Sequence, residues 1–223
     1  MNKSIPTFRD FWNKNYAVSC FPPTWYIFQR LGAILAFTGF RFGISPNGMT
    51  ALGGVLGFIT IWLFGTLPND NISSIQLAIM FAIVYSFDCS DGQLARATGK
   101  TSDWGKWFDL TIDLLLIILF PLGIVFFLHG IFSVLQLSGL ILILTFGRAL
   151  ALLTSAIKRT DGENHTPSNS ILKKVFQSIV DTPTFYVILC LFRVQPDWLF
   201  YTSMAYGLLF VFVGIYFSKS FIK

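Results

Sequence analysis

The fold is decided by residues 74–128, which read SIQLAIMFAIVYSFDCSDGQLARATGKTSDWGKWFDLTIDLLLIILFPLGIVFFL. Two mostly apolar runs, 74–97 and 104–128, are separated by a short polar connection. Each run is long enough to cross a bilayer, because a spanning helix needs about 20 predominantly apolar residues. Since the connection is short, the two predicted helices are antiparallel neighbours. The stretch therefore predicts a helical membrane protein, and it carries an unusual number of acidic residues.

The composition of the whole chain supports a membrane protein. Of its 223 residues, 54% are hydrophobic and only 12% are charged, whereas about a quarter of a soluble domain is charged. The net charge of +5 does not indicate nucleic-acid binding, because the basic residues lie between apolar runs instead of forming a patch. Six spans are predicted, at 46–66, 74–97, 104–128, 131–157, 176–193 and 196–218. The fifth is the weakest of them, because Asp181 and Pro183 interrupt it.

The positions of the basic residues orient these spans. If the first span starts at Pro46 on the cytoplasmic side, fourteen of the 16 Lys and Arg residues lie on that side, as the positive-inside rule requires. Arg193 flanks the other side, and one arginine is embedded. Both termini are then cytoplasmic, and residues 25–41 within the N-terminal segment 1–45 form an interfacial helix. The prediction is a single all-α membrane domain with a six-helix bundle over 46–218.

Four aspartates lie where apolar residues are expected, although a charge at membrane depth costs a few kcal/mol. They are Asp88, Asp91, Asp109 and Asp113. Helical spacing places the first two on one face of their helix and the last two on one stripe of the next, so the acidic faces can meet. Facing carboxylates repel one another unless cations lie between them. Mg²⁺ prefers such oxygen ligands together with substrate phosphate, and a two-metal site suits phosphoryl displacement.

Three neighbours of the aspartates fit phosphate chemistry. Gly92 and Ala95 leave room for a bulky ligand beside the helix, and Arg96 offers a planar fork of donors to a phosphate. With the aspartates and Gly105 they form the pattern D-x2-D-G-x2-A-R-x8-G-x3-D-x3-D over residues 88–113. This pattern resembles the signature of the CDP-alcohol phosphotransferases, also called CDP-alcohol phosphatidyltransferases. All eight fixed positions of the pattern match.

The resemblance implies a membrane enzyme that binds a CDP-linked donor, transfers a substituted phosphate group to an alcohol and releases CMP. It implies two Mg²⁺ or Mn²⁺ ions, held by Asp88, Asp91 and Asp109. Asp113 is then the general base and a further candidate ligand. The resemblance also implies a homodimer. The topology predicted from the basic residues makes the active site face the cytoplasm. The expected donor-binding residues are Gly92, Ala95, Arg96 and Gly105, together with Asn47 and Thr50, whose Pro-Asn-x-x-Thr sequence resembles a family feature.

Two residues outside the motif are candidates for the acceptor site. Arg148 lies inside the fourth predicted span, and an intramembrane arginine indicates function. It binds either a phosphate or carboxylate of the acceptor, or a structural partner such as Asp181. Asp181 itself either lines the acceptor pocket or stabilises a kink next to Pro183.

The sequence leaves two substrate arrangements open. In the first, CDP-diacylglycerol or an ether-lipid relative donates to inositol, inositol phosphate, glycerol phosphate or serine. In the second, CDP-choline or CDP-ethanolamine donates to diacylglycerol. Arg148 favours the first arrangement, whereas the local sequence DGQLARAT at 91–98 resembles the choline/ethanolamine branch. A cation transporter is the alternative from another class, because intramembrane carboxylates also line ion paths.

Overall fold

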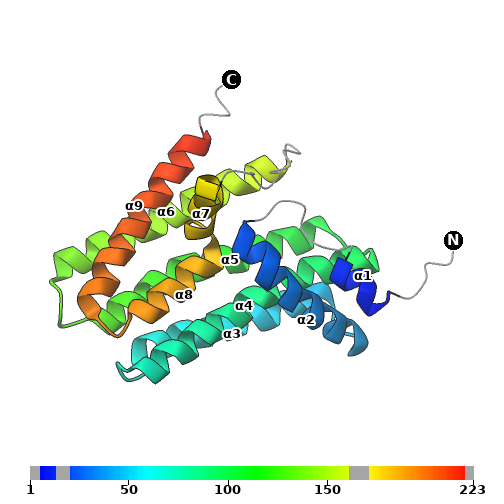
Figure 1. Ribbon diagram of the computed structural model, residues 1–223, viewed down its shortest axis with the longest axis horizontal. Coiled ribbons are helices and arrows are strands. Elements are labelled where there is room, and N and C mark those ends of the chain that lie inside the picture. Colours follow the sequence, from blue (N-terminus) through cyan, green and yellow to red (C-terminus); the bar gives the residue numbers. More distant parts are fainter. Residues whose placement is uncertain (1–5, 14–20, 161–170, 219–223) are drawn as a thin grey trace. The chain divides into compact units, whose positions relative to one another are not determined.

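The computed structural model describes residues 6–13, 21–160 and 171–218, and these residues form a series of helices (Figure 1). The N-terminal helices are α1 (Phe8–Asn13), the π-helix η1 (Thr24–Phe28) and α2 (Gln29–Arg41). The long helices are α3 (Pro46–Thr66), α4 (Asn71–Thr98), α5 (Asp103–Leu128), α6 (Val134–Thr160) and α9 (Pro196–Ser218). Two shorter helices are α7 (Ile171–Ile179) and α8 (Thr182–Phe192).

Five helices of the described chain are long and apolar enough to cross a membrane. They are α3, α4, α5, α9 and the Val134–Thr154 part of α6. The protein is therefore an all-α polytopic membrane protein, as predicted. The first and last predicted spans coincide with α3 and α9, and the predicted interfacial helix over 25–41 coincides with η1 and α2.

The count of six spans is not confirmed, because the predicted span over 176–193 is not one helix. Helix α7 ends at Ile179, and α8 starts at Thr182 and has only 11 residues. Pro183 accounts for the break, since it lacks an N–H and its ring clashes with the preceding turn. At about 1.5 Å per residue, α8 covers roughly half of a 30 Å hydrocarbon core.

The chain forms two compact units. The first unit contains the described residues within Met1–Gly57, Met80–Asp113 and His165–Pro183. The second unit contains those within Phe58–Ile79, Leu114–Asn164 and Thr184–Lys223. Helices α3, α4 and α5 each pass from one unit into the other. All four motif aspartates belong to the first unit, and Arg148 belongs to the second. The single domain over 1–223 stays a prediction.

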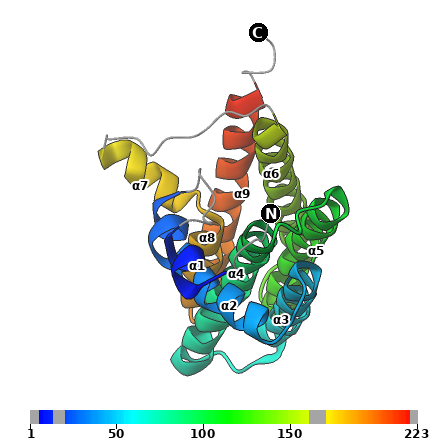
Figure 2. The same ribbon diagram turned by 90° about the vertical axis from the view of Figure 1, so that its right-hand side faces the viewer.

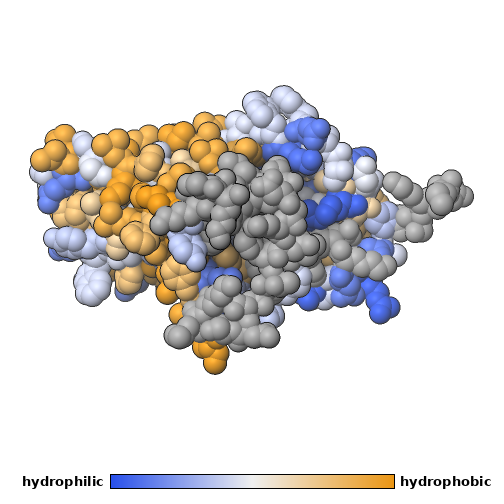
Figure 3. Space-filling view, turned by 90° about the horizontal axis from the view of Figure 1, so that it is seen from above, coloured by the Kyte–Doolittle hydropathy of each residue, from blue (hydrophilic) through white to orange (hydrophobic). Residues whose placement is uncertain are grey.

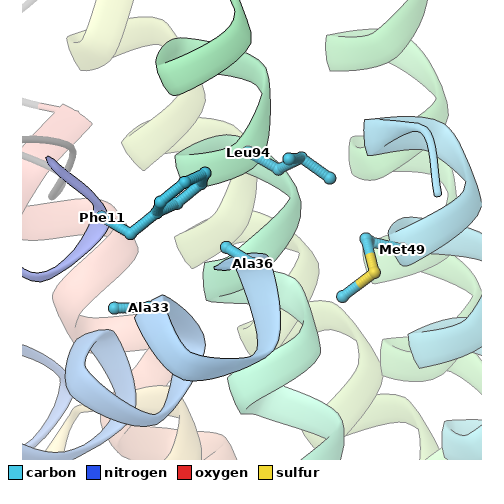
Figure 4. Packing of buried hydrophobic residues seen from close by; sticks show 5 residues of the cluster. All are labelled: Phe11, Ala33, Ala36, Met49 and Leu94. Carbon is cyan, nitrogen blue, oxygen red and sulfur yellow. The ribbon is translucent and has the colours of Figure 1, made fainter. Parts of the chain in front are cut away.

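Small residues let the N-terminal helices pack closely against α3 and α4 in the first unit. The core cluster seen in Figure 4 brings together Phe11 of α1, Ala33 and Ala36 of α2, Met49 of α3 and Leu94 of α4. A Cβ added to Gly32 of α2 would lie 2.8 Å from the Cβ of Cys89. Beside this contact, the buried Gln93 amide donates to the backbone and side-chain oxygens of Gln29, at 2.9 and 2.6 Å. Helix α2 is thus attached to the part of α4 that carries the motif.

Helices α6 and α9 lie side by side in the second unit (Figures 1 and 2). Glycines allow this close approach, since a Cβ on Gly147 would lie 2.5 Å from the carbonyl oxygen of Gly207, and a Cβ on Gly214 would meet Leu150 at 2.5 Å. The outer surfaces of these helices are apolar: Leu142 is 71% exposed and Phe212 is 78% exposed. Figure 3 shows a broad apolar area on one face, as expected for side chains that contact lipid.

We expect Gly147→Ala to destabilise the second unit by about 1–3 kcal/mol, because the new methyl group meets a backbone oxygen that cannot move aside. Gly139→Ala is the matched control on the same helix, since a Cβ there meets nothing within 4 Å. That control should be neutral or slightly stabilising. Thermal unfolding in detergent measures both variants, and equal melting temperatures would show that the helices do not pack as described.

Candidate active site

Two adjacent glycines of α3 allow α4 and α5 to converge in the first unit. A Cβ on Gly53 would lie 2.9 Å from the Cβ of Phe87 in α4, and a Cβ on Gly54 would lie 3.0 Å from Ile112 in α5. Phe87 and Ile112 directly precede Asp88 and Asp113 in the sequence. The glycine pair therefore fixes how closely the two acid-bearing helices approach α3, and with it the position of the aspartates.

Three of the four predicted aspartates form one cluster. A carboxylate oxygen from each of Asp88, Asp109 and Asp113 lies within 4.8 Å of the other two, and all three residues are half-buried. Three such oxygens repel one another strongly when charged. They also match the oxygen ligands that Mg²⁺ and other hard divalent cations take in proteins. The donor set therefore fits the metal that the motif implies.

Asp91 lies beside this cluster in a different environment. It is buried, and the Thr50 hydroxyl of α3 donates a 2.5 Å hydrogen bond to its Oδ2. Asp109 and Asp113 are close enough to act on it electrostatically. Such a hydrogen bond to a carboxylate fixes its orientation, as bonds from surrounding residues do for metal ligands. Thr50, predicted to contact the donor, is thus also placed to orient Asp91.

The predicted donor-binding residues lie around the same helices. Gly92 packs against Arg96, because a Cβ at Gly92 would lie 3.0 Å from a guanidinium nitrogen of Arg96. The Arg96 side chain is exposed, and Ala95 is half-buried on the same helix. A Cβ at Gly105, near the start of α5, would lie 3.1 Å from the Asn47 amide oxygen of α3. The two glycines thus leave space beside the polar groups expected to bind the donor.

We expect Thr50→Val to lower the rate of CMP release about 10–100-fold and to raise the divalent-metal concentration needed for activity. The reason is that Asp91 loses the donor that orients it, and such losses typically have effects of this size. Thr66→Val is the matched control, since the Thr66 hydroxyl bonds to the Trp62 carbonyl of its own helix, α3. Metal titrations of activity compare the variants. An unchanged metal requirement in Thr50→Val would contradict this role.

The two predicted acceptor residues are both buried. The Arg148 guanidinium lies over aromatic rings of the second unit, 4.6 Å from the centre of Phe210, 5.1 Å from that of Phe185 and 5.8 Å from that of Tyr186. Such rings attract a cation. Asp181 lies in the first unit at the break between α7 and α8, and the Thr24 hydroxyl of η1 donates a 2.7 Å hydrogen bond to it.

Sequence reasoning missed Thr24 and the glycine pair of α3. Thr24 follows two prolines near the N-terminus, and nothing in its local sequence connects it with Asp181, 157 residues away. The glycine pair carried a usable signal, because adjacent glycines within an apolar span indicate close backbone packing.

The CDP-alcohol phosphatidyltransferase family profile matches residues 43–214. Since this match covers well over half of the chain, the protein belongs to that family and is a membrane-embedded phosphotransferase of the CDP-alcohol type. Over 85 residues the chain is 38% identical to the archaetidylinositol phosphate synthase of Pyrococcus horikoshii, and this stretch covers 38% of the chain. The chain thus spans only 40% of that relative's length.

Membership of the family confirms the predicted enzyme class. It implies a CDP-linked donor and an alcohol acceptor, and the family is generally dependent on divalent metal. The cation-transporter alternative is thereby set aside.

Proposed function

We propose that the enzyme transfers a phosphatidyl-type group from CDP-diacylglycerol, or an ether-lipid relative of it, to inositol phosphate, and releases CMP. The observation that carries this choice is the similarity to a synthase of archaetidylinositol phosphate. Buried Arg148 is a second support, because an anionic acceptor calls for a cation within the protein. Inositol and glycerol phosphate are the other acceptors of this arrangement.

The motif aspartates hold two Mg²⁺ or Mn²⁺ ions in this proposal. Asp88, Asp91 and Asp109 are the ligands, and Asp113 lies close enough to Asp88 and Asp109 to join them. When bound, the ions would neutralise the donor's pyrophosphate charge and stabilise the negative charge that develops during transfer.

The reaction is a single displacement. Asp113 accepts the proton of the acceptor hydroxyl, and the resulting oxygen attacks the phosphorus distal to cytidine. A new P–O bond forms to the acceptor, while the bond from that phosphorus to the bridging oxygen breaks. CMP leaves with the electron pair, and Arg96 stabilises its charge. Positioning and charge stabilisation account for most of the catalysis in such transfers.

The acceptor is bound by Arg148 and Asp181 in this proposal. The Arg148 guanidinium can hold the acceptor's phosphate with two parallel hydrogen bonds. The Asp181 carboxylate can accept hydrogen bonds from ring hydroxyls while it keeps its bond from Thr24.

Arg148→Lys keeps the positive charge but loses the planar guanidinium that can donate two parallel hydrogen bonds. In steady-state kinetics of CMP release, this variant should raise the acceptor KM and leave the donor KM unchanged.

The remaining features of the proposal concern the membrane. We propose that the active site and both termini face the cytoplasm, and the basic residues between the predicted spans support this orientation. The enzyme works as a homodimer, as its family resemblance implies.

A choline or ethanolamine phosphotransferase is the second candidate. The sequence at 91–98, DGQLARAT, followed by a serine and a Phe-Asp pair, resembles that branch. In this case the donor is CDP-choline or CDP-ethanolamine, the acceptor is diacylglycerol, and the aspartates keep the same roles.

The deciding experiment measures CMP release by the purified protein with Mg²⁺. CDP-diacylglycerol is paired with inositol phosphate, inositol, glycerol phosphate and serine, and CDP-choline and CDP-ethanolamine are paired with diacylglycerol. We expect the highest activity with CDP-diacylglycerol and inositol phosphate. Activity confined to CDP-choline or CDP-ethanolamine would overturn the donor assignment. A preference for an uncharged acceptor such as inositol would overturn the proposed role of Arg148.

A further inference from the structure

Helix α7 separates apolar from polar positions completely. At about 100° per residue, its apolar positions Ile171, Leu172, Val175, Phe176 and Ile179 fall within an arc of about 140°. The other arc contains Lys173, Lys174, Gln177 and Ser178. This segregation is typical of helices that lie at a boundary between water and an apolar phase.

The apolar arc of α7 faces outward. Its large side chains Ile171, Val175, Phe176 and Ile179 are 78%, 53%, 46% and 42% exposed. Four such side chains on a nine-residue helix form a contiguous apolar surface, which calls for an apolar partner.

The position of α7 within its unit is fixed at its C-terminal end. Val180, directly after the helix, is buried, and Asp181 accepts the hydrogen bond from Thr24 of η1. Figure 2 shows α7 near the N-terminal helices of its own unit. Nine residues cover only about 14 Å, less than half of a hydrocarbon core, so α7 cannot span the bilayer.

We infer that α7 lies in the plane of the membrane, with its apolar arc in the lipid interface and its polar arc toward the headgroups and water. Three observations favour lipid over a protein partner. The described part of the chain has five helices that are long and apolar enough to cross a membrane. The chain continues from α7 into a further apolar segment, because the apolar helix α8 begins three residues after α7 ends.

The third observation is charge. The polar arc carries Lys173 and Lys174 and no acidic residue, which is the pattern of interfacial helices that bind anionic leaflets. A bilayer satisfies both arcs at once, because its interface offers acyl chains below and anionic headgroups above. The inference concerns membrane placement and holds whichever substrates the enzyme uses.

Spin-label accessibility tests this placement. Single cysteines replace Val175 and Ile179 on the apolar arc, and Gln177 and Ser178 on the polar arc. Cys20 is changed to serine. Cys89 and Cys190 are buried and stay, and the parent chain without an added cysteine measures background labelling. Phe212→Cys on α9 and Lys100→Cys calibrate lipid and water exposure. The labelled full-length protein is placed in nanodiscs that contain anionic lipid.

We expect labels at 175 and 179 to collide mainly with oxygen, as at 212, and labels at 177 and 178 mainly with a water-soluble nickel chelate, as at 100. Equal nickel accessibility on both arcs would mean that α7 lies in water, and the inference would be wrong. Low accessibility to both reagents at 175 and 179 would mean that protein, such as a second copy of the chain, covers this face. That result would equally overturn it. Neither outcome depends on catalytic activity.

Discussion

Asp113→Asn should lower the rate of CMP release by about 10²–10⁴-fold while the protein stays folded. Asparagine has nearly the same shape, but its amide cannot take a proton from the acceptor hydroxyl, and general-base catalysis is typically worth this factor. The half-buried carboxylate of Asp113 lies within 4.8 Å of those of Asp88 and Asp109. Removing one negative charge from such a cluster should stabilise the metal-free protein. Activity and thermal stability therefore change in opposite directions.

The matched control for this substitution is Asp103→Asn on the same helix. The Asp103 side chain is 99% exposed and pairs with Lys106 at 3.0 Å, so its loss should leave CMP release unchanged. Metal titration then distinguishes the two roles of Asp113. If Asp113 is a base and not a metal ligand, Asp113→Asn leaves the divalent-metal concentration needed for activity unchanged. If Asp113 is also a ligand, the variant needs a higher metal concentration. Substantial activity in Asp113→Asn would remove this residue from the mechanism.

Arg193→Met should lower the stability of the folded protein strongly. Arg193 is fully buried. Its Nε donates to the Phe64 carbonyl at 2.9 Å, its Nη1 to that of Pro68 at 2.7 Å, and its Nη2 to that of Leu67. Phe64 lies in the last turn of α3, where helix carbonyls lack intrahelical partners, and Leu67 and Pro68 directly follow the helix. The guanidinium also lies 4.1 Å from the ring centre of Phe127.

Losing the Arg193 guanidinium leaves the buried Phe64 carbonyl without this donor and removes the hydrogen bonds to the part-buried carbonyls of Leu67 and Pro68, so we expect a cost of about 3 kcal/mol or more. Methionine roughly preserves the apolar length of the side chain, which isolates the loss of the hydrogen bonds. Arg41→Met is the control, since Arg41 is exposed at the end of α2. Arg193→Lys should restore only part of the stability, because one ammonium group cannot reproduce the planar fork. Equal unfolding temperatures for the two methionine variants would show that the helix end does not depend on Arg193.

The acidic site could be predicted from the sequence because its residues are local. Asp88, Asp109 and Asp113 lie on two helices joined by a short connection, so helical periodicity alone indicated that they meet. The same reasoning grouped Asp91 with them. It could not show that Asp91 is bonded to Thr50, because that contact joins two helices 41 residues apart.

Other features depend on contacts that no local pattern contains. The break between α7 and α8 was treated as an interruption within one span, because hydropathy averaged over 176–193 stays high on both sides of Asp181. Arg193 stood out only as a basic residue on the wrong side of the predicted topology. Its role at the end of α3 depends on contacts with residues 125–129 positions earlier.

The packing of α2 against α4 has a consequence for how the protein can be trimmed. The region shared with the family begins at residue 43, yet Ala33 and Ala36 of α2 complete the core around Met49 and Leu94. A fragment that begins at residue 43 would keep every motif residue. It would lose α2, which packs against the helix that carries Asp88 and Asp91. We therefore expect a stable fragment to need α2 in addition to the region that the family shares.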